Sequence, residues 1–320
     1  MDSGAQERGD WPRWIDPETI LKLDSLELRA RIVVEGFLSG LHRSPYHGFS
    51  AEFSEYRAYV PGDDLRYLDW KLYARSDRQY IKRFEDETNV RCQLLVDLSR
   101  SMGFGHERSP KSEYAITLAA TLARFLSKQR DAVGLLTFDE EVTEFLPARH
   151  RPGHLQRLLV ALERSTAGTS TGLVASLQKA SLLLRKRGVV VLISDLLSPL
   201  EGLDAAFGQL AARGHEVLCL RVLDPAEVTF PFEKASRFED LESGESVYVD
   251  PKQGAEGYRE RFDEHRRGIE QLCHTHGIDL VEWTTDRALS DVLHEYLQAR
   301  VRRGVRTQRR GNIVGGGARR

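Results

Sequence analysis

Five oxygen-bearing side chains in three separate stretches of the sequence could together hold a metal ion. Asp97, Ser99 and Ser101 form a D-x-S-x-S pattern, and Thr169 and Asp195 lie further along the chain. All five offer hard oxygen ligands and none is a thiolate or an imidazole, so Mg²⁺ or Mn²⁺ is favoured over zinc. Only two of the five carry charge, so a bound ion would keep positive character and an open position for an acidic group from outside.

Two apolar runs end where the two carboxylates begin. The run CQLLV (92–96) precedes Asp97, and VVVLIS (189–194) precedes Asp195. Short apolar runs without polar alternation are typical of strands buried on both faces of a parallel sheet. Ligands collect beyond the carboxyl ends of such strands, so the two carboxylates are predicted to meet at one sheet edge.

Helical patterns alternate with further apolar runs along the chain. Other strands are predicted at 132–138, 216–223 and 278–283, with a hairpin partner at 141–146. Helices are predicted at about 111–129, 153–164, 173–186, 201–213, 256–276 and 287–302. This alternation predicts an α/β fold with a doubly wound, mostly parallel sheet.

The arrangement resembles a von Willebrand factor type A domain. That family has a metal-ion-dependent adhesion site made of D-x-S-x-S after the first strand, a Thr in a small glycine-containing loop and an Asp after a later strand. Thr169 in AGTSTG matches the second part, with Thr171 as a neighbouring candidate, and Asp195 matches the third. Leu196 stands where a glycine often follows, which weakens the loop geometry without removing a ligand. The resemblance implies recognition of a partner's acidic residue through Mg²⁺ or Mn²⁺.

A second motif, EYRAYVPGDDLRYLDWKLYARSDRQYIKRFEDE (55–87), precedes the first strand of that domain. It resembles the hallmark box of the family catalogued as domain of unknown function 58, in which the box is joined to a von Willebrand factor A-like domain. Genes of that family typically lie beside those of MoxR-type AAA+ ATPases, which implies such an ATPase as partner. The resemblance covers about residues 20–300. The matching positions are Tyr59, Pro61, Gly62, Asp63, Asp64, Arg66, Asp69, Trp70, Ala74 and Arg75.

The residues of this box allow two interpretations. Its Pro-Gly pair suits the centre of a type II turn. Three aspartates lie close to Arg66 in the sequence, which suits a bidentate ion pair together with hydrogen bonds in the turn. A structural latch with Trp70 as its apolar anchor is the favoured interpretation. An acidic surface that contacts a partner or a substrate peptide is the alternative.

Composition bounds the organisation of the chain. Its 320 residues, 41% of them hydrophobic, are enough for one large domain and a small one. We expect a disordered N-terminus (1–16), an N-terminal helix and β extension (17–89), a von Willebrand factor A-like domain (90–302) and a disordered Arg- and Gly-rich tail (303–320). The tail has no aromatic residues, so nucleic-acid binding is not expected.

Other features narrow the location and the chemistry. No apolar stretch is long enough to cross a bilayer and the N-terminus has no signal-peptide core, so a cytoplasmic protein without a membrane partner is expected. Cys92, Cys219 and Cys273 are expected to be buried, reduced thiols. No Walker loop, nucleophile elbow or dinucleotide fingerprint is found.

The predicted function is therefore that of a non-enzymatic adaptor. Its Mg²⁺ would bind an acidic residue of a MoxR-type AAA+ ATPase or of a client protein that the pair remodels. The alternative is a metal-dependent hydrolase or phosphotransferase that uses the same pocket. Such an enzyme needs a general base, and His106 is the nearest candidate in the sequence.

Overall fold

The chain divides into two compact units, residues 41–89 and the rest of the chain. The computed structural model describes residues 17–41, 56–58, 73, 80–82, 90–106, 109–165, 172–234, 236–239 and 246–298. In the unit of residues 41–89, strands β1 (Tyr56–Ala58) and β2 (Tyr80–Lys82) form an antiparallel pair. The predicted latch residues from Tyr59 to Trp70 lie outside the described residues.

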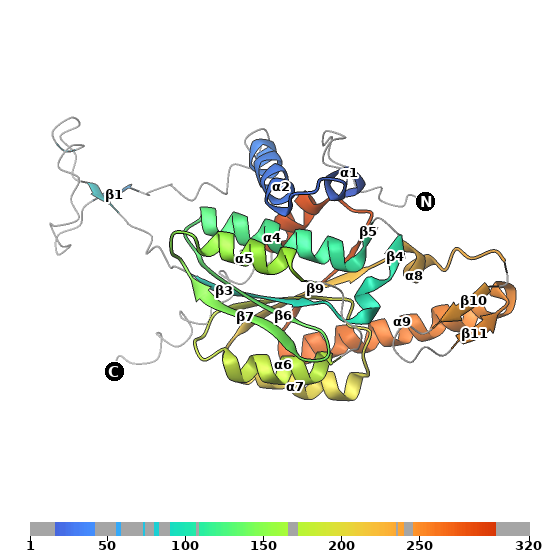
Figure 1. Cartoon of the computed structure of the whole chain (residues 1–320). Coiled ribbons are helices and arrows are strands. Elements are labelled where there is room, and N and C mark those ends of the chain that lie inside the picture. Colours follow the sequence, from blue (N-terminus) through green and yellow to red (C-terminus); the bar gives the residue numbers. More distant parts are fainter. Residues whose placement is uncertain are drawn as a thin grey trace, which may run out of the picture. The chain divides into compact units, whose positions relative to one another are not determined.

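A six-stranded sheet with the order β12-β9-β8-β3-β6-β7 lies at the centre of the larger unit (Figure 1). All its strand pairs are parallel except the edge pair of β6 and β7, which is the predicted hairpin. The predicted doubly wound, mostly parallel fold is thereby confirmed. The strands are β3 (Arg91–Asp97), β6 (Ala132–Phe138), β7 (Val142–Arg149), β8 (Val189–Ser194), β9 (Glu216–Leu223) and β12 (Asp279–Thr284).

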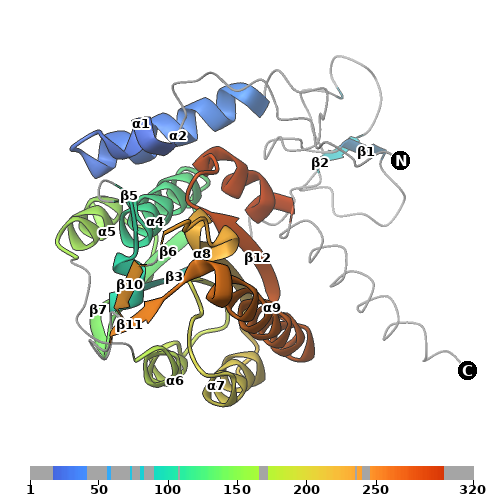
Figure 2. The same ribbon diagram turned by 90° about the vertical axis from the view of Figure 1, so that its right-hand side faces the viewer.

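Helices cover both faces of this sheet, as Figures 1 and 2 show. Helices α4 (Lys111–Lys128) and α5 (His154–Glu163) lie on one face. Helices α6 (Leu173–Leu183), α7 (Leu200–Ala212) and α9 (Pro251–His276) lie on the other. Two further helices, α1 (Pro17–Leu21) and α2 (Leu26–Leu41), belong to the same unit, and the ring of Phe37 in α2 meets that of Phe125 in α4 edge to face, at 5.8 Å.

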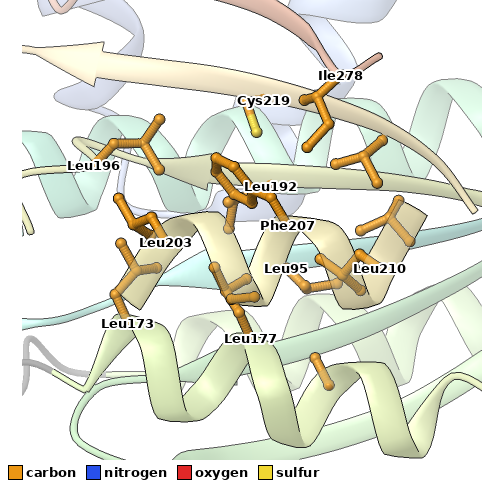
Figure 3. Packing of buried hydrophobic residues seen from close by; sticks show 14 of the residues in the cluster. Leu95, Leu173, Leu177, Leu192, Leu196, Leu203, Phe207, Leu210, Cys219 and Ile278 are labelled. Carbon is orange, nitrogen blue, oxygen red and sulfur yellow. The ribbon is translucent and has the colours of Figure 1, made fainter. Parts of the chain in front are cut away.

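The core forms because the central strands are apolar on both sides. Leu95 and Leu192 point to the face of α6 and α7 and pack in one cluster with Leu177 and Phe207 (Figure 3). Successive side chains of a strand alternate between the two faces of a sheet, so the equally buried Leu94 faces the helices of the other layer. Each fully buried leucine contributes about 1.5–3 kcal/mol to folding. The central strands, and with them the site residues at their ends, are therefore held firmly.

Several short elements escaped prediction from the sequence. They are η3 (Arg100–Gly103), β4 (Gly105–His106), β5 (Ser109–Pro110), α8 (Pro225–Thr229), β10 (Ser236–Glu239) and β11 (Ser246–Val249). All are too short to show a periodic apolar pattern, which is the main sequence signal for helices and strands. Of them, α8 and η3 matter most, because both carry residues of the site described below.

Two further predictions concern individual residues and helices. Cys92, Cys219 and Cys273 are all buried and none forms a disulfide, as predicted. Among the described residues, no helix combines the length and the apolar character that a membrane span requires. The last described helix, residues 289–298, follows β12.

Candidate functional site at the carboxyl edge of the sheet

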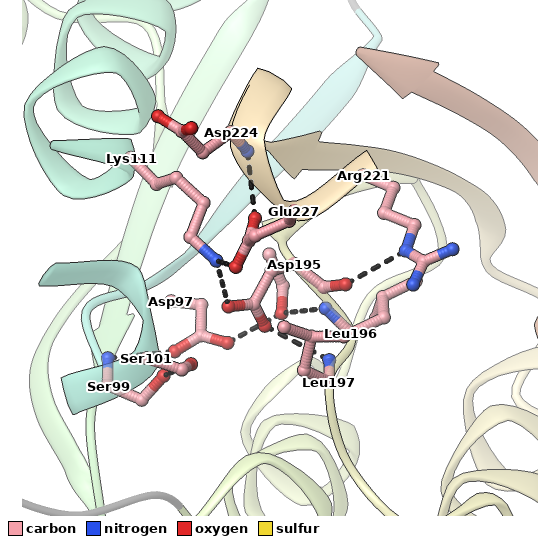
Figure 4. Close-up of polar contacts among 11 residues, drawn as sticks. Asp97, Ser99, Ser101, Lys111, Asp195, Leu196, Leu197, Arg221, Asp224 and Glu227 are labelled. Atoms are coloured by element: carbon pink, nitrogen blue, oxygen red, sulfur yellow. Dashed lines mark hydrogen bonds and ion pairs between the residues drawn. The ribbon is translucent and has the colours of Figure 1, made fainter. Parts of the chain in front are cut away.

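Asp97 and Asp195 lie side by side at the carboxyl edge of the sheet (Figure 4). Asp97 is the last residue of β3, and Asp195 directly follows β8, which pairs with β3 in parallel with Val96 opposite Ile193. Both aspartates are buried: the exposed fraction of the residue surface is 1% for Asp97 and 2% for Asp195. The register of two neighbouring parallel strands thus brings together two residues that are far apart in the sequence.

The D-x-S-x-S segment folds around the carboxylate of Asp97. The backbone N–H of Ser99 donates a hydrogen bond to Oδ1 of Asp97 at 2.9 Å, which is the local turn that aspartate favours. The hydroxyl of Ser194 donates to Oδ2 of Asp97 at 2.5 Å. The chain then enters η3, and the hydroxyls of Ser99 and Ser101 lie 3.2 Å apart. This geometry aligns two hydroxyls and one carboxylate at the strand end.

The surroundings of Asp97 disfavour the negative charge of its carboxylate. Burial raises the pKa of Asp97 to about 6, and the negative charge of Asp195 adds to this rise. Hydrogen bonds from Ser194 and Ser99 act in the opposite direction but do not cancel it. A positive charge placed beside Asp97 would lower this pKa and relieve the repulsion between the two carboxylates.

Lys111 is a site residue that sequence reasoning missed. It is the first residue of α4, its side chain is completely buried, and its ammonium lies 2.8 Å from Oδ2 of Asp195 and 2.6 Å from Oε1 of Glu227. Burial acts to lower the pKa of Lys111, but the two carboxylates outweigh it and raise the pKa overall. Lys111 is therefore a fixed positive charge. Its sequence signal was weak, because a lysine at the start of a helix is usually solvated.

Glu227 reaches this lysine from helix α8. Asp224 caps α8 by accepting a hydrogen bond from the backbone N–H of Ala226 at 2.8 Å, and Oε2 of Glu227 accepts one from the backbone N–H of Asp224 at 2.8 Å. The hydroxyl of Tyr258 in α9 donates to the backbone carbonyl of Glu227 at 2.8 Å. The sequence signal was present in D-P-A-E (224–227), which has the spacing of a capping box.

A second buried, positively charged side chain, that of Arg221, contacts the backbone of the site. The Nε of Arg221, in β9, donates to the backbone carbonyl of Asp195 at 2.9 Å, and its Nη1 lies 3.2 Å from Glu282 of β12. Burial lowers the pKa of Arg221. Arg221 binds the backbone carbonyl of Asp195 rather than its carboxylate, so it fixes the turn after β8. The carboxylate of Asp195 forms its ion pair with Lys111.

Leu196 adopts a backbone conformation that favours glycine, the residue that the resemblance led us to expect at this position. Leu196 has φ 55°, in the left-handed region that side chains disfavour, and it is buried in the core cluster. Its backbone N–H donates to the hydroxyl of Ser194 at 3.0 Å, and that of Leu197 donates to Oδ1 of Asp195 at 3.0 Å. The turn after β8 therefore forms despite the leucine, at a cost of about 1–2 kcal/mol.

Thr169 lies outside the described residues, but the end of its loop is placed. The backbone N–H of Gly172 donates at 2.9 Å to the carbonyl of Asp139, the residue after β6. A Cβ on Gly172 would lie only 1.9 Å from the carbonyl oxygen of Glu140, so no larger residue fits there. The loop that carries Thr169 thus ends beside β6, the parallel neighbour of β3. His106, the candidate base of the alternative function, lies in β4.

The described residues fit a hard divalent cation at Asp97. Adjacent oxygen ligands of Mg²⁺, each bonded at about 2.1 Å, lie about 3 Å apart, and the hydroxyls of Ser99 and Ser101 are separated by 3.2 Å. Asp97 supplies charge beside them, whereas Oδ2 of Asp195 is already bound to Lys111. No group of three or more His, Cys, Asp or Glu suited to a metal occurs among the described residues, so hydroxyls would have to complete the ligand set.

Comparison with known proteins gives a family match and distant structural likenesses. The family model described as "Protein of unknown function DUF58" matches residues 55–271. A curated Mycobacterium tuberculosis relative, named "Uncharacterized protein Rv1480", is 29% identical over 306 residues, which cover 94% of this chain and 93% of the relative.

Two solved structures are similar to part of the chain. The crystal structure of the conserved hypothetical protein BatB from Bacteroides thetaiotaomicron has a TM-score of 0.47 and 16% identity, over 67% of this chain and 99% of the chain in that structure. The SpRpn10 VWA domain has a TM-score of 0.38 and 12% identity, over 64% of this chain and 95% of that domain. The doubly wound, mostly parallel fold of this chain rests on its own strand order and helix layers rather than on these distant likenesses.

Proposed function

We propose that this chain, which belongs to the DUF58 family, is a non-enzymatic adaptor that binds an acidic residue of a partner protein through Mg²⁺ or Mn²⁺. The partner in this proposal is a MoxR-type AAA+ ATPase or a client that the two remodel together in the cytoplasm. The observation that carries the proposal is the meeting of Asp97, Ser99 and Ser101 with Asp195 at one buried sheet edge, where the pKa of Asp97 is raised to about 6.

In this proposal, each residue of the site has its own role in holding the cation. The hydroxyls of Ser99 and Ser101 would be direct ligands, since both are held beside Asp97 by the turn and by η3. Asp97 would supply the nearest negative charge, and Ser194 keeps its carboxylate oriented. Thr169 is proposed as a further ligand. The cation would supply a positive centre with an exchangeable position, which an incoming carboxylate can take in place of water.

Adaptor function is favoured over hydrolysis by the chemistry of the site. Lys111, a buried basic side chain at the site, is held in its charged form by Asp195 and Glu227 and cannot accept a proton. Asp97, with Ser194 and the backbone N–H of Ser99 bound to its two oxygens, is occupied in shaping the turn. Catalysis by a metal-bound water needs a base within hydrogen-bond reach. The described groups serve binding better than proton transfer.

The proposal is tested by measuring complex formation with a purified MoxR-type ATPase. Wild-type protein, Ser99→Ala and Ser176→Ala are compared in pull-downs that contain either Mg²⁺ or EDTA. The Mg²⁺ concentration is about 5 mM, chosen to be roughly saturating for a protein site of modest affinity. Ser176 is a matched control, because its buried hydroxyl in α6 has no hydrogen-bond partner among the described residues. We expect capture by wild type and Ser176→Ala in Mg²⁺ only, and at least tenfold weaker capture by Ser99→Ala.

Equal capture by all three proteins, or capture that ignores EDTA, would show that the partner does not bind through a cation at this edge. Hydrolysis of a phosphate ester by wild type but not by Ser99→Ala would instead favour the enzymatic alternative. Circular dichroism of each variant excludes loss of folding as the cause of weak capture.

A further inference from the structure

The position of Lys111 calls for an explanation beyond the fold. A buried ammonium is costly unless it is paired, and the nearby core could have been closed by an apolar side chain. Lys111 instead extends from the first turn of α4 to the carboxylates that follow β8 and β9 (Figure 4). One of these, Asp195, is the acid shared with the predicted cation site.

Charges alternate along this edge of the sheet. Glu227, Lys111 and Asp195 follow one another at ion-pair distance, 2.6 and 2.8 Å, and Asp97 comes next, near enough to Asp195 for the two carboxylates to repel each other. The ammonium thus neutralises the charge of Asp195. A divalent cation that approached Asp195 would meet a fixed positive charge on the same carboxylate.

We propose that Lys111 is a resident counter-ion that competes with the divalent cation for Asp195 and so sets the metal affinity of this site. This inference rests on the proposed function, because it concerns the same cation. The two serine hydroxyls remain direct ligands and Asp97 the nearest negative charge, and the cation is held only weakly until an acidic partner residue adds its charge. Metal binding and partner binding are then mutually dependent, since each raises the affinity for the other.

The consequence is a gain of affinity when a positive charge is removed. In a buried site the attraction between Asp195 and a divalent cation is weakly screened, so replacing Lys111 by an uncharged residue should raise metal affinity by at least about tenfold. The opposite holds if Lys111 merely supports the site, because losing it would then disorder Asp195 and weaken metal binding.

The experiment is a calorimetric titration of the full chain with Mg²⁺ and with Mn²⁺. Lys111→Met removes the charge and keeps most of the side-chain volume, and Lys111→Arg keeps the charge. Lys128→Met is the matched control, because it removes an exposed lysine from the last turn of the same helix. The double variant Lys111→Met/Glu227→Gln guards against misfolding, since it also neutralises the carboxylate left buried by Lys111→Met.

We expect tighter binding in Lys111→Met and in the double variant, and wild-type affinity in Lys111→Arg and Lys128→Met. Binding by Lys111→Met where the wild type shows none would support the inference equally. If the wild type binds and neither variant without Lys111 binds more tightly, the inference is overturned while the proposed function stands. If no protein binds either metal, the cation-mediated function and this inference both fail.

Discussion

Two halves of the same sheet edge differ in how their charges are balanced. In the paired half, made of Lys111, Asp195 and Glu227, buried opposite charges lie within 2.8 Å of each other. In the hydroxyl half, made of Asp97, Ser99 and Ser101, one carboxylate is surrounded by hydroxyl and N–H donors and its pKa is raised to about 6. The charges of the first half neutralise one another, whereas a cation would stabilise the carboxylate of the second half. In our proposal, the paired half stabilises the fold and tunes the affinity for the cation, and the hydroxyl half supplies its direct ligands.

Breaking the paired half should have the largest effect on stability. Lys111→Met leaves two buried carboxylates without their cation, and removal of one partner of a buried ion pair costs about 3–5 kcal/mol. Urea denaturation without metal measures this loss. Lys111→Met/Asp195→Asn/Glu227→Gln, which removes all three charges, should recover most of it, and an equal loss in both proteins would show that the charges are not the cause.

Adding metal should stabilise the protein mainly through the hydroxyl half. A ligand at 100 times its Kd stabilises a folded protein by about 2.7 kcal/mol, so saturating Mg²⁺ should raise the Tm of the wild type. Ser101→Ala should lose most of this rise but keep its Tm in EDTA, because the hydroxyl of Ser101 contacts only that of Ser99 among the described hydrogen bonds. Differential scanning calorimetry gives both values. A rise that survives in Ser101→Ala would place the cation elsewhere.

Removing the cap of α8 tests whether that helix positions the paired half. Asp224→Ala loses the hydrogen bond from the backbone N–H of Ala226, and loss of an N-cap typically costs about 1 kcal/mol. Urea denaturation should show this moderate loss, smaller than that of Lys111→Met. Thr229→Ala, at the other end of the same helix, is the control. A loss as large as that of Lys111→Met would mean that α8 itself holds the ion pairs together.

The smallest effect is expected from an ion pair in the same turn of α4 as Lys111. Glu113 lies 2.8 Å from Arg29 of α2, but 45% of its side chain is exposed, whereas that of Lys111 is fully buried. Exposed ion pairs contribute about 0–1 kcal/mol, so Glu113→Gln should change the free energy of unfolding by less than 1 kcal/mol. A loss of several kcal/mol would show that exposure does not explain the difference between these two neighbours.

The fold could be predicted because each central strand carries its own local signal. The run before Asp97 and the run before Asp195 proved to be neighbouring parallel strands, and the box at 55–87 lies within the segment that the DUF58 family model matches. Helix α8 and the pair of β10 and β11 could not be found in this way, because elements of four or five residues are set by caps and partners rather than by apolar periodicity.

The candidate site was predictable only in part. Four of its five predicted ligands are described, and the sheet brings Asp97 and Asp195 together with Ser99 and Ser101 beside Asp97. Whether they bind Mg²⁺ remains a prediction, as do the role of Thr169, the latch between Tyr59 and Trp70 and the ATPase partner. Nothing in the local sequence distinguished Lys111 from the other lysines of the chain.

The sequence by itself determined that two acids would end two buried parallel strands, because short apolar runs and the edge of a parallel sheet leave little other choice. Only the tertiary structure decided how these acids are neutralised. Lys111 is 84 residues from Asp195 and 116 from Glu227, and pairing over such distances depends on how α4 and α8 pack against the sheet. Electrostatic attraction acts through space rather than along the chain, so no spacing in the sequence could reveal it.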